Sequence, residues 1–249
     1  MHTQSAPRAT LLALGGPEPV LQEAELAHSD HTKALYLGSL LQTALLNPAQ
    51  TDHALAFATN ISSDYELRRA LQQAMNTQSL DAARLALLLT TGKQIDSDYE
   101  LSPLLQEAAA FMPADALARA AWLAAAGQLD SDYELGQAIE KGLMPSSADA
   151  VFATALITLA AERMESGYEL RRVLSAVAVR DPDPTLASAH LDAVSPIDSD
   201  HERRLALERI APRVAADAEL IRRYRELARS MGDYDRGQAL TALDDATRD

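Results

Sequence analysis

The 249-residue sequence contains no cysteine, and this absence excludes three kinds of feature at once. Without thiols the chain has no disulfide framework, no cysteine-ligated zinc and no thiol catalysis. Aromatic residues are also scarce, at 4% of the chain with a single Trp, although 47% of the residues are apolar. That apolar content is normal for a folded protein and too high for a disordered one.

Basic residues are outnumbered: 22 Lys and Arg stand against 36 Asp and Glu, and the net charge is −14. Nucleic-acid-binding proteins concentrate Lys and Arg against phosphates, and anionic membrane surfaces attract basic segments. The composition therefore argues against both and favours a protein or peptide partner with a basic patch. No stretch approaches the roughly 20 apolar residues that span a bilayer, so we expect no direct membrane insertion of this chain.

Fingerprints of catalysis are missing as well. The sequence has no Gly-x-Ser-x-Gly elbow, no Gly-x-x-x-x-Gly-Lys loop, no dinucleotide fingerprint and no His-Glu-x-x-His helix. Paired carboxylates occur only as parts of a repeated motif, whereas a catalytic site is normally unique. We therefore expect no catalytic site, no cofactor and no metal site, and we predict that the chain is not an enzyme.

What the sequence does contain is a short motif that returns about every 34 residues. Its clearest copy is Asp-Ser-Asp-Tyr-Glu-Leu, at residues 96–101 and again at residues 130–135. The spacings from one copy to the next are 34, 34, 34, 35, 33 and 33, counted at the Tyr or at the His that replaces it: His31, Tyr65, Tyr99, Tyr133, Tyr168, His201 and Tyr234. A fixed period of this length is typical of helical repeat proteins.

Each copy of the motif predicts the start of a helix. Ser-x-x-Glu before an apolar-periodic run is a capping box, in which the Ser hydroxyl accepts the backbone N–H three residues on and the Glu carboxylate accepts the N–H of the Ser. Ser63 with Glu66 and Ser97 with Glu100 fit this pattern. The position six residues after the Tyr is apolar in all seven copies, and with the fifth and ninth positions it forms one stripe along the helix.

A second segment, rich in Ala and Leu, precedes each motif and also favours a helix. No segment alternates with the two-residue period of a strand. We therefore predict an all-α chain: a flexible polar lead-in at 1–17, then a single right-handed α-solenoid domain over 18–247, built from about seven helical hairpins. The predicted hairpins are 18–47, 50–77, 80–111, 114–144, 147–180, 185–212 and 215–247.

The period is that of tetratricopeptide repeats, which leaves a superhelix of that type as an alternative, but their Trp-x-x-Leu-Gly-x-x-Tyr signature is absent. The short two-helix units resemble HEAT-type repeats. More narrowly, the Ser-Asp-Tyr-Glu motif resembles bacterial helical tandem repeats, some of which are attached to sensor-type zinc metallopeptidases of the membrane. The resemblance covers roughly residues 26–240 and implies a bacterial protein of the periplasm or the cytoplasm, with no catalytic residue carried over.

Two sets of motif residues are candidates for a partner-binding edge. The acidic set contains Asp64, Asp98, Asp132 and Asp200, which the motif places at successive helix starts. Helix capping and favourable contact with the helix dipole explain these carboxylates; a metal ladder and a docking edge for a basic partner are the alternatives. The aromatic set contains Tyr65, Tyr99, Tyr133 and Tyr168, read either as a structural ladder with each hydroxyl bonded across the turn or as a row that grips a peptide.

The remaining features favour structural roles. His28 and His31 have a spacing compatible with zinc, but no third or fourth ligand accompanies them. The arginine pairs, such as Arg68 with Arg69, predict ion pairs on the helix surface. Trp122, the one Trp, lies among Ala residues and is predicted to be part of the core.

These observations lead to three functional hypotheses. The first is a non-catalytic helical-repeat scaffold that mediates protein–protein or peptide binding. The second is an extracytoplasmic sensor or regulatory repeat module of a larger membrane protein. The third is an enzyme or ligand-binding protein on a helical scaffold, which predicts one deep pocket with unique polar residues.

Overall fold

The computed structural model describes residues 15–144, 149–178 and 184–248. Within these ranges it contains fourteen α-helices and no strand, so the all-α prediction is confirmed. Most of the predicted lead-in at 1–17 lies outside the described residues. The chain divides into two compact units, one ending at Leu129 and one beginning at Asp130.

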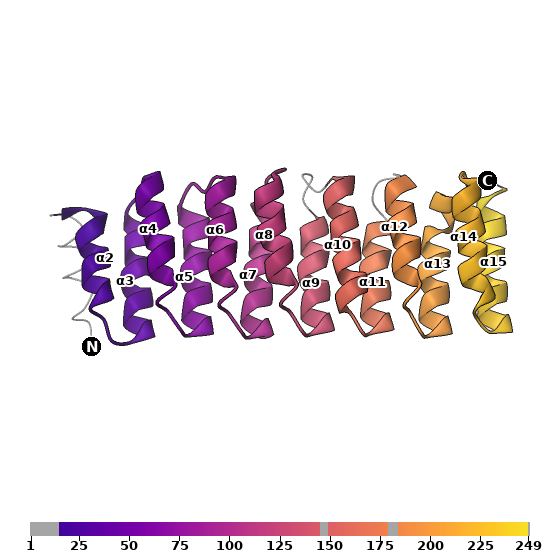
Figure 1. Cartoon of the computed structure of the whole chain (residues 1–249), viewed down its shortest axis with the longest axis horizontal. Helices are drawn as coiled ribbons and strands as arrows, with labels where there is room; N and C mark the ends of the chain where they lie inside the picture. The colour runs from indigo at the N-terminus through magenta and orange to yellow at the C-terminus, as the bar shows by residue number, and fades with distance from the viewer. Residues whose placement is uncertain (1–14, 145–148, 179–183, 249) are drawn as a thin grey trace. The chain divides into compact units, whose positions relative to one another are not determined.

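The N-terminal unit is a stack of helices in two rows (Figure 1). In one row α3 packs on α5 and α5 on α7; in the other α2 packs on α4, α4 on α6 and α6 on α8. Sequential helices pack across the rows. The helices are α2 (Pro17–Glu25), α3 (Asp30–Thr43), α4 (Pro48–Ala58), α5 (Asp64–Thr77), α6 (Ala82–Gly92), α7 (Asp98–Ala110) and α8 (Ala116–Ala126).

The C-terminal unit repeats this arrangement. One row contains α9, α11, α13 and α15, the other α10, α12 and α14, and each helix packs on the next one in its row. Its helices are α9 (Asp132–Leu143), α10 (Ala150–Arg163), α11 (Gly167–Ala178), α12 (Pro184–Val194), α13 (Asp200–Val214), α14 (Ala218–Arg229) and α15 (Asp233–Ala246). Packing from neighbour to neighbour along rows is the arrangement of an α-solenoid.

Helix starts follow the motif. In the row of α5 and α9, Ser63 and Ser131 accept the backbone N–H three residues on, as predicted. The other row has its own caps, whose side chains accept N–H groups of the first turn and whose spacing the motif analysis missed. These caps also lie 34 residues apart or twice that: Asn47, Asp81, Asp115, Asp149 and Asp217.

The predicted apolar stripe forms the core of both units. Six of the seven residues at the position six after the Tyr are buried, and Leu240 in the last helix is half-buried. Because α15 is the last described helix, no later helix of this chain packs against it. The buried six are Leu37, Leu71, Leu105, Ile139, Leu174 and Leu207.

Large buried rings occupy one recurring core position on α8, α12 and α14. Trp122, His190 and Tyr224 lie 34 residues apart or twice that, and all three are fully buried. Each places a polar ring atom on a helix carbonyl: Trp122 Nε1 donates to Leu105 O (3.0 Å), His190 Nε2 lies 3.2 Å from Ala206 O, and the Tyr224 hydroxyl donates to Ala239 O (2.8 Å). The core prediction for Trp122 is confirmed.

Candidate functional site

The motif Asp residues connect successive turns of the stack. A carboxylate oxygen of Asp64 accepts the backbone N–H of Ser97 (2.9 Å), and one of Asp200 accepts the N–H of Gly232 (2.9 Å). Asp132 accepts two, from Glu165 (3.0 Å) and Ser166 (2.5 Å). Each acceptor lies in the first turn of its own helix and bonds the turn that starts the next helix of the row. These carboxylates are half-buried and already engaged in holding the stack together.

The motif Glu residues form bonds different from those predicted. The Ser half of the capping box is present, but no Glu of α5, α9 or α13 closes it, because these carboxylates turn elsewhere. Glu100 of α7 pairs with Arg68 of α5 (2.5 Å), and Glu202 of α13 pairs with Arg171 of α11. The backbone N–H that the box would satisfy is taken by the Asp of the preceding repeat, as at Ser97.

These ion pairs follow a rule along the sequence. Where the third position after the Tyr is Arg, it pairs with the carboxylate that follows the Tyr of the next copy. Arg204 obeys the same rule, since its Nε lies 2.8 Å from the Asp235 carboxylate. The predicted ion pairs therefore exist, but these three join neighbouring helices rather than residues of one helix. Pairs at this depth are screened less by solvent than fully exposed ones.

The motif Tyr rings face outward. Tyr65, Tyr133 and Tyr168 are about half exposed (49%, 53% and 53%), and Tyr99 is 76% exposed. Within the described residues, no hydrogen bond reaches the hydroxyls of these four rings, so the bond predicted across the turn is not present. Instead, arginine guanidinium groups lie over three of the rings at 5.0–5.5 Å from the ring centre, a cation–π distance.

The exposed acidic row differs from the predicted one. Four carboxylates three residues before the Tyr lie on the surface, whereas Asp64, Asp132 and Asp200 are half-buried. The same 34-residue spacing marks this row, so the sequence contained the signal. Its members are Asp96, Asp130, Glu165 and Asp198.

A polar groove of about 690 Å³ runs over α3, α5 and α7 in the N-terminal unit. Its walls carry amide side chains, two arginines and two glutamates, with a short apolar floor around Ala34 and Leu35. The polar members are Ser39, Gln42, Tyr65, Glu66, Arg68, Arg69, Gln72, Gln73, Asn76 and Glu107.

Polar bridges join the helices along this groove. Gln42 of α3 donates from Nε2 to Gln73 Oε1 of α5 (3.1 Å), and Asn76 of α5 donates to Glu107 of α7 (2.5 Å). At one end, Glu66 lies 2.6 Å from His31 Nδ1. Gly38 lies in the middle of the wall, and a Cβ added there would meet no atom within 4 Å. The absence of a side chain at Gly38 keeps the groove open.

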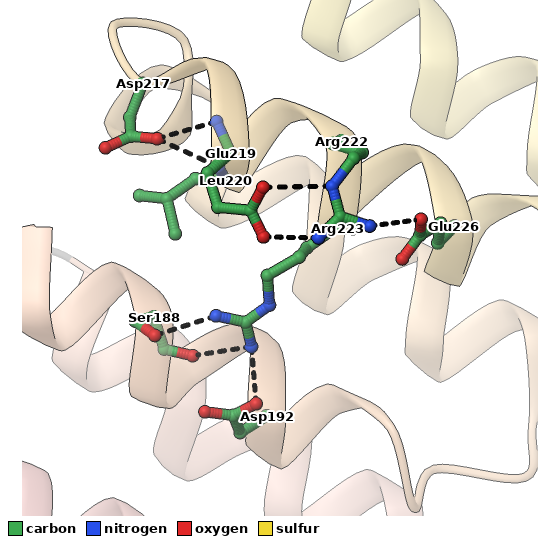
Figure 2. A network of polar contacts seen from close by, with 8 residues as sticks. All are labelled: Ser188, Asp192, Asp217, Glu219, Leu220, Arg222, Arg223 and Glu226. Carbon is green, nitrogen blue, oxygen red and sulfur yellow. Dashed lines mark hydrogen bonds and ion pairs between the residues drawn. The ribbon is translucent and has the colours of Figure 1, made fainter.

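The C-terminal unit has a smaller cleft of about 330 Å³ between α10 and α12. Hydroxyl groups of Thr154, Thr158 and Ser188 line it. Figure 2 shows one side of this region, where Arg223 extends from α14 to α12 and donates to Ser188 Oγ (2.8 Å) and to the Asp192 carboxylate. Its carboxylate at Asp192 is thus paired already.

The described residues give no support for a metal ladder. Across these ranges no group of three or more His, Asp or Glu side chains is arranged to hold an ion. Nor does any helix in them combine the length and apolarity that crossing a membrane requires. The sequence matches no known protein-family model, and a search of curated proteins finds no significant match.

Proposed function

We propose that this chain is a non-catalytic helical-repeat scaffold that binds an extended peptide segment of a protein partner along α3, α5 and α7. The observation that carries the proposal is the polar groove, which three successive helices of one row line together. Its volume falls within the range of about 300–1,000 Å³ typical of ligand sites. Because the side chains come from three neighbouring helices, an elongated ligand laid across the row would contact all of them.

Rigidity of the row supports this function. The bonds from Asp30 to Ser62 N–H (3.0 Å) and from Asp64 to Ser97 N–H fix the turns, and the pair of Arg68 with Glu100 fixes the helices beside the groove. A site that is already ordered loses less conformational entropy on binding, so more of the contact energy appears as affinity.

The non-catalytic part of the proposal rests on the same bonds. A general acid or base needs a carboxylate that can exchange its proton with a substrate. The repeated carboxylates Asp64, Asp132 and Asp200 instead accept backbone N–H groups of the stack. Their repetition matches a structural role better than a catalytic one.

The net charge of −14 adds long-range steering. A partner with a basic patch would be attracted and an acidic surface repelled, chiefly by exposed carboxylates such as Asp96 and Asp198. Attachment to a membrane sensor, as the resemblance to metallopeptidase-linked bacterial repeats implies, is a further hypothesis about the setting in which this scaffold works.

The test is a selection from a displayed library of random peptides of about ten residues, enough to cross three helices in extended form. We expect peptides that bind the wild-type chain and the Gly237→Trp variant but not Gly38→Trp. Both glycines lie on helices with open space around their Cα, so both variants should fold, and only Gly38→Trp fills the groove. The absence of binding peptides, or equal binding to both variants, would refute the proposal.

A further inference from the structure

The groove presents an unsatisfied pattern of donors and acceptors. The bridge from Gln42 Nε2 to Gln73 Oε1 uses one donor and one acceptor of the two amides. This leaves Gln42 Oε1 as an acceptor and Gln73 Nε2 as a donor, with neither group engaged in another of the described bonds. One acceptor beside one donor is the complement of a peptide unit, which offers one N–H and one C=O.

One cation of the groove is only weakly engaged. Arg68 pairs with Glu100 and also donates to Gln72 Oε1 (2.6 Å). Arg69, in contrast, reaches only Glu66 at 3.5 Å, and its side chain is 52% exposed. Glu66 has a nearer partner in His31 at 2.6 Å. Arg69 therefore keeps most of its five N–H donors available.

The Tyr65 ring restrains this cation. The Arg69 guanidinium carbon lies 5.4 Å from the centre of the ring, where cation–π attraction operates. A guanidinium held in this way loses less freedom when it forms a bidentate pair with a carboxylate, which is the partner that its planar fork fits.

We propose that the groove binds an extended peptide that carries a carboxylate, with Arg69 pairing with this carboxylate and the amides of Gln42 and Gln73 bonding the main chain. This inference rests on the proposed function. Neighbouring helices of a row lie roughly 8–10 Å apart, so about six extended residues would reach from α3 to α7. The carboxylate comes either from an Asp or Glu side chain or from the free end of the peptide.

The negative net charge does not oppose this contact. The charged groups of the groove are balanced, with Arg68 and Arg69 against Glu66 and Glu107. Charges elsewhere on the surface are screened over about 8 Å at physiological ionic strength. Long-range attraction of a basic partner and local pairing with one carboxylate of that partner are therefore compatible.

The experiment measures dissociation constants for peptides recovered from the random library, by fluorescence anisotropy. Each peptide is made in its original form, with Asp and Glu replaced by Asn and Gln, and with an amidated end. We expect one of the two neutralised forms to bind about tenfold more weakly, as for loss of a charged hydrogen-bonded pair. The form that weakens identifies the source of the carboxylate.

Arg69→Gln should produce the same tenfold loss, and neutralising the peptide should then cost nothing more. The control is Arg222→Gln, which removes an arginine of similar exposure (56%) on α14 and should leave affinity unchanged. If peptides bind in the groove but Arg69→Gln has no effect, or if neutralisation costs the same in both backgrounds, the carboxylate inference is wrong while the groove proposal stands. If no peptide binds, both are wrong.

Discussion

His190 predicts a pH-dependent loss of stability in the C-terminal unit. The imidazole is fully buried between α12 and α13, and only its Nε2 has a hydrogen-bonding partner, the carbonyl of Ala206. Burial lowers the pKa of His190 from 6.5 to about 4, since the charged ring would lose its hydration. The unfolded chain therefore takes up the proton first as pH falls.

The sign and size follow from this difference in pKa. The stability contribution of neutral His190 is fully present above pH 6.5 and is lost progressively as pH falls towards 4. At about 1.4 kcal/mol per pH unit, we expect a loss of about 2 kcal/mol between pH 7 and pH 5.

A His190→Leu variant removes the titrating group without creating a cavity, because Leu88 and Leu156 occupy the same repeat position and are fully buried. Amide hydrogen exchange across α12 and α13 reports the local free energy of opening, which suits a repeat protein that need not unfold in one step. We expect the drop between pH 7 and pH 5 to be about 2 kcal/mol smaller in the variant. Equal drops, or an imidazole resonance of His190 that titrates near pH 6.5, would refute the reasoning.

Three other substitutions test the bonds of the stack. Asp132→Ala removes an acceptor of two N–H groups and should cost roughly 2–4 kcal/mol in urea unfolding, whereas Asp130→Ala in the same turn should cost less than about 1 kcal/mol, because its side chain is 90% exposed; similar losses would contradict the role of Asp132. Gly136→Ala should lower the melting temperature despite the better helix propensity of Ala, since the new Cβ would lie 2.8 Å from Arg172 Nη2; an unchanged or higher temperature would show that Arg172 moves aside freely. Tyr224→Phe should cost roughly 1 kcal/mol through loss of the buried bond to a carbonyl, and because burial raises the pKa of Tyr224, its phenol should stay protonated in alkaline titrations that ionise exposed tyrosines.

Much of the fold was predictable because the repeat carries its own local signals. Ser63 and Ser131 mark helix starts through bonds that reach only three residues, and the buried residues Leu71 and Leu105 lie on a stripe set by helical geometry. Trp122 lies in the core for the same reason. Features that depend on three to four residues of sequence separation can be inferred from a pattern of spacing.

The bonds between repeats were harder to predict. Asp64 has the right place for a capping residue, and nothing within its own helix shows that its carboxylate bonds Ser97, which lies 33 residues later. The Glu of each motif was assigned to its own Ser because that contact is local. In the structure the neighbouring repeat competes for both groups, and the arginine at the third position after the Tyr, as at Arg68, offers the Glu a charged partner. A charged partner binds a carboxylate more strongly than a backbone N–H does.

The groove shows where repetition ends and individual character begins. The Asp and Ser of the motif recur because every turn must be bonded to the next in the same way. The outward position eight residues after the Tyr has no such task, and its chemistry differs from copy to copy: Ser39, Gln73, Glu107, Lys141, Ala176, Arg209 and Ala242. Side chains at this position line the groove in the N-terminal unit. Constant residues therefore build a rigid row, and the variable residues that the row displays are the ones that distinguish one ligand from another.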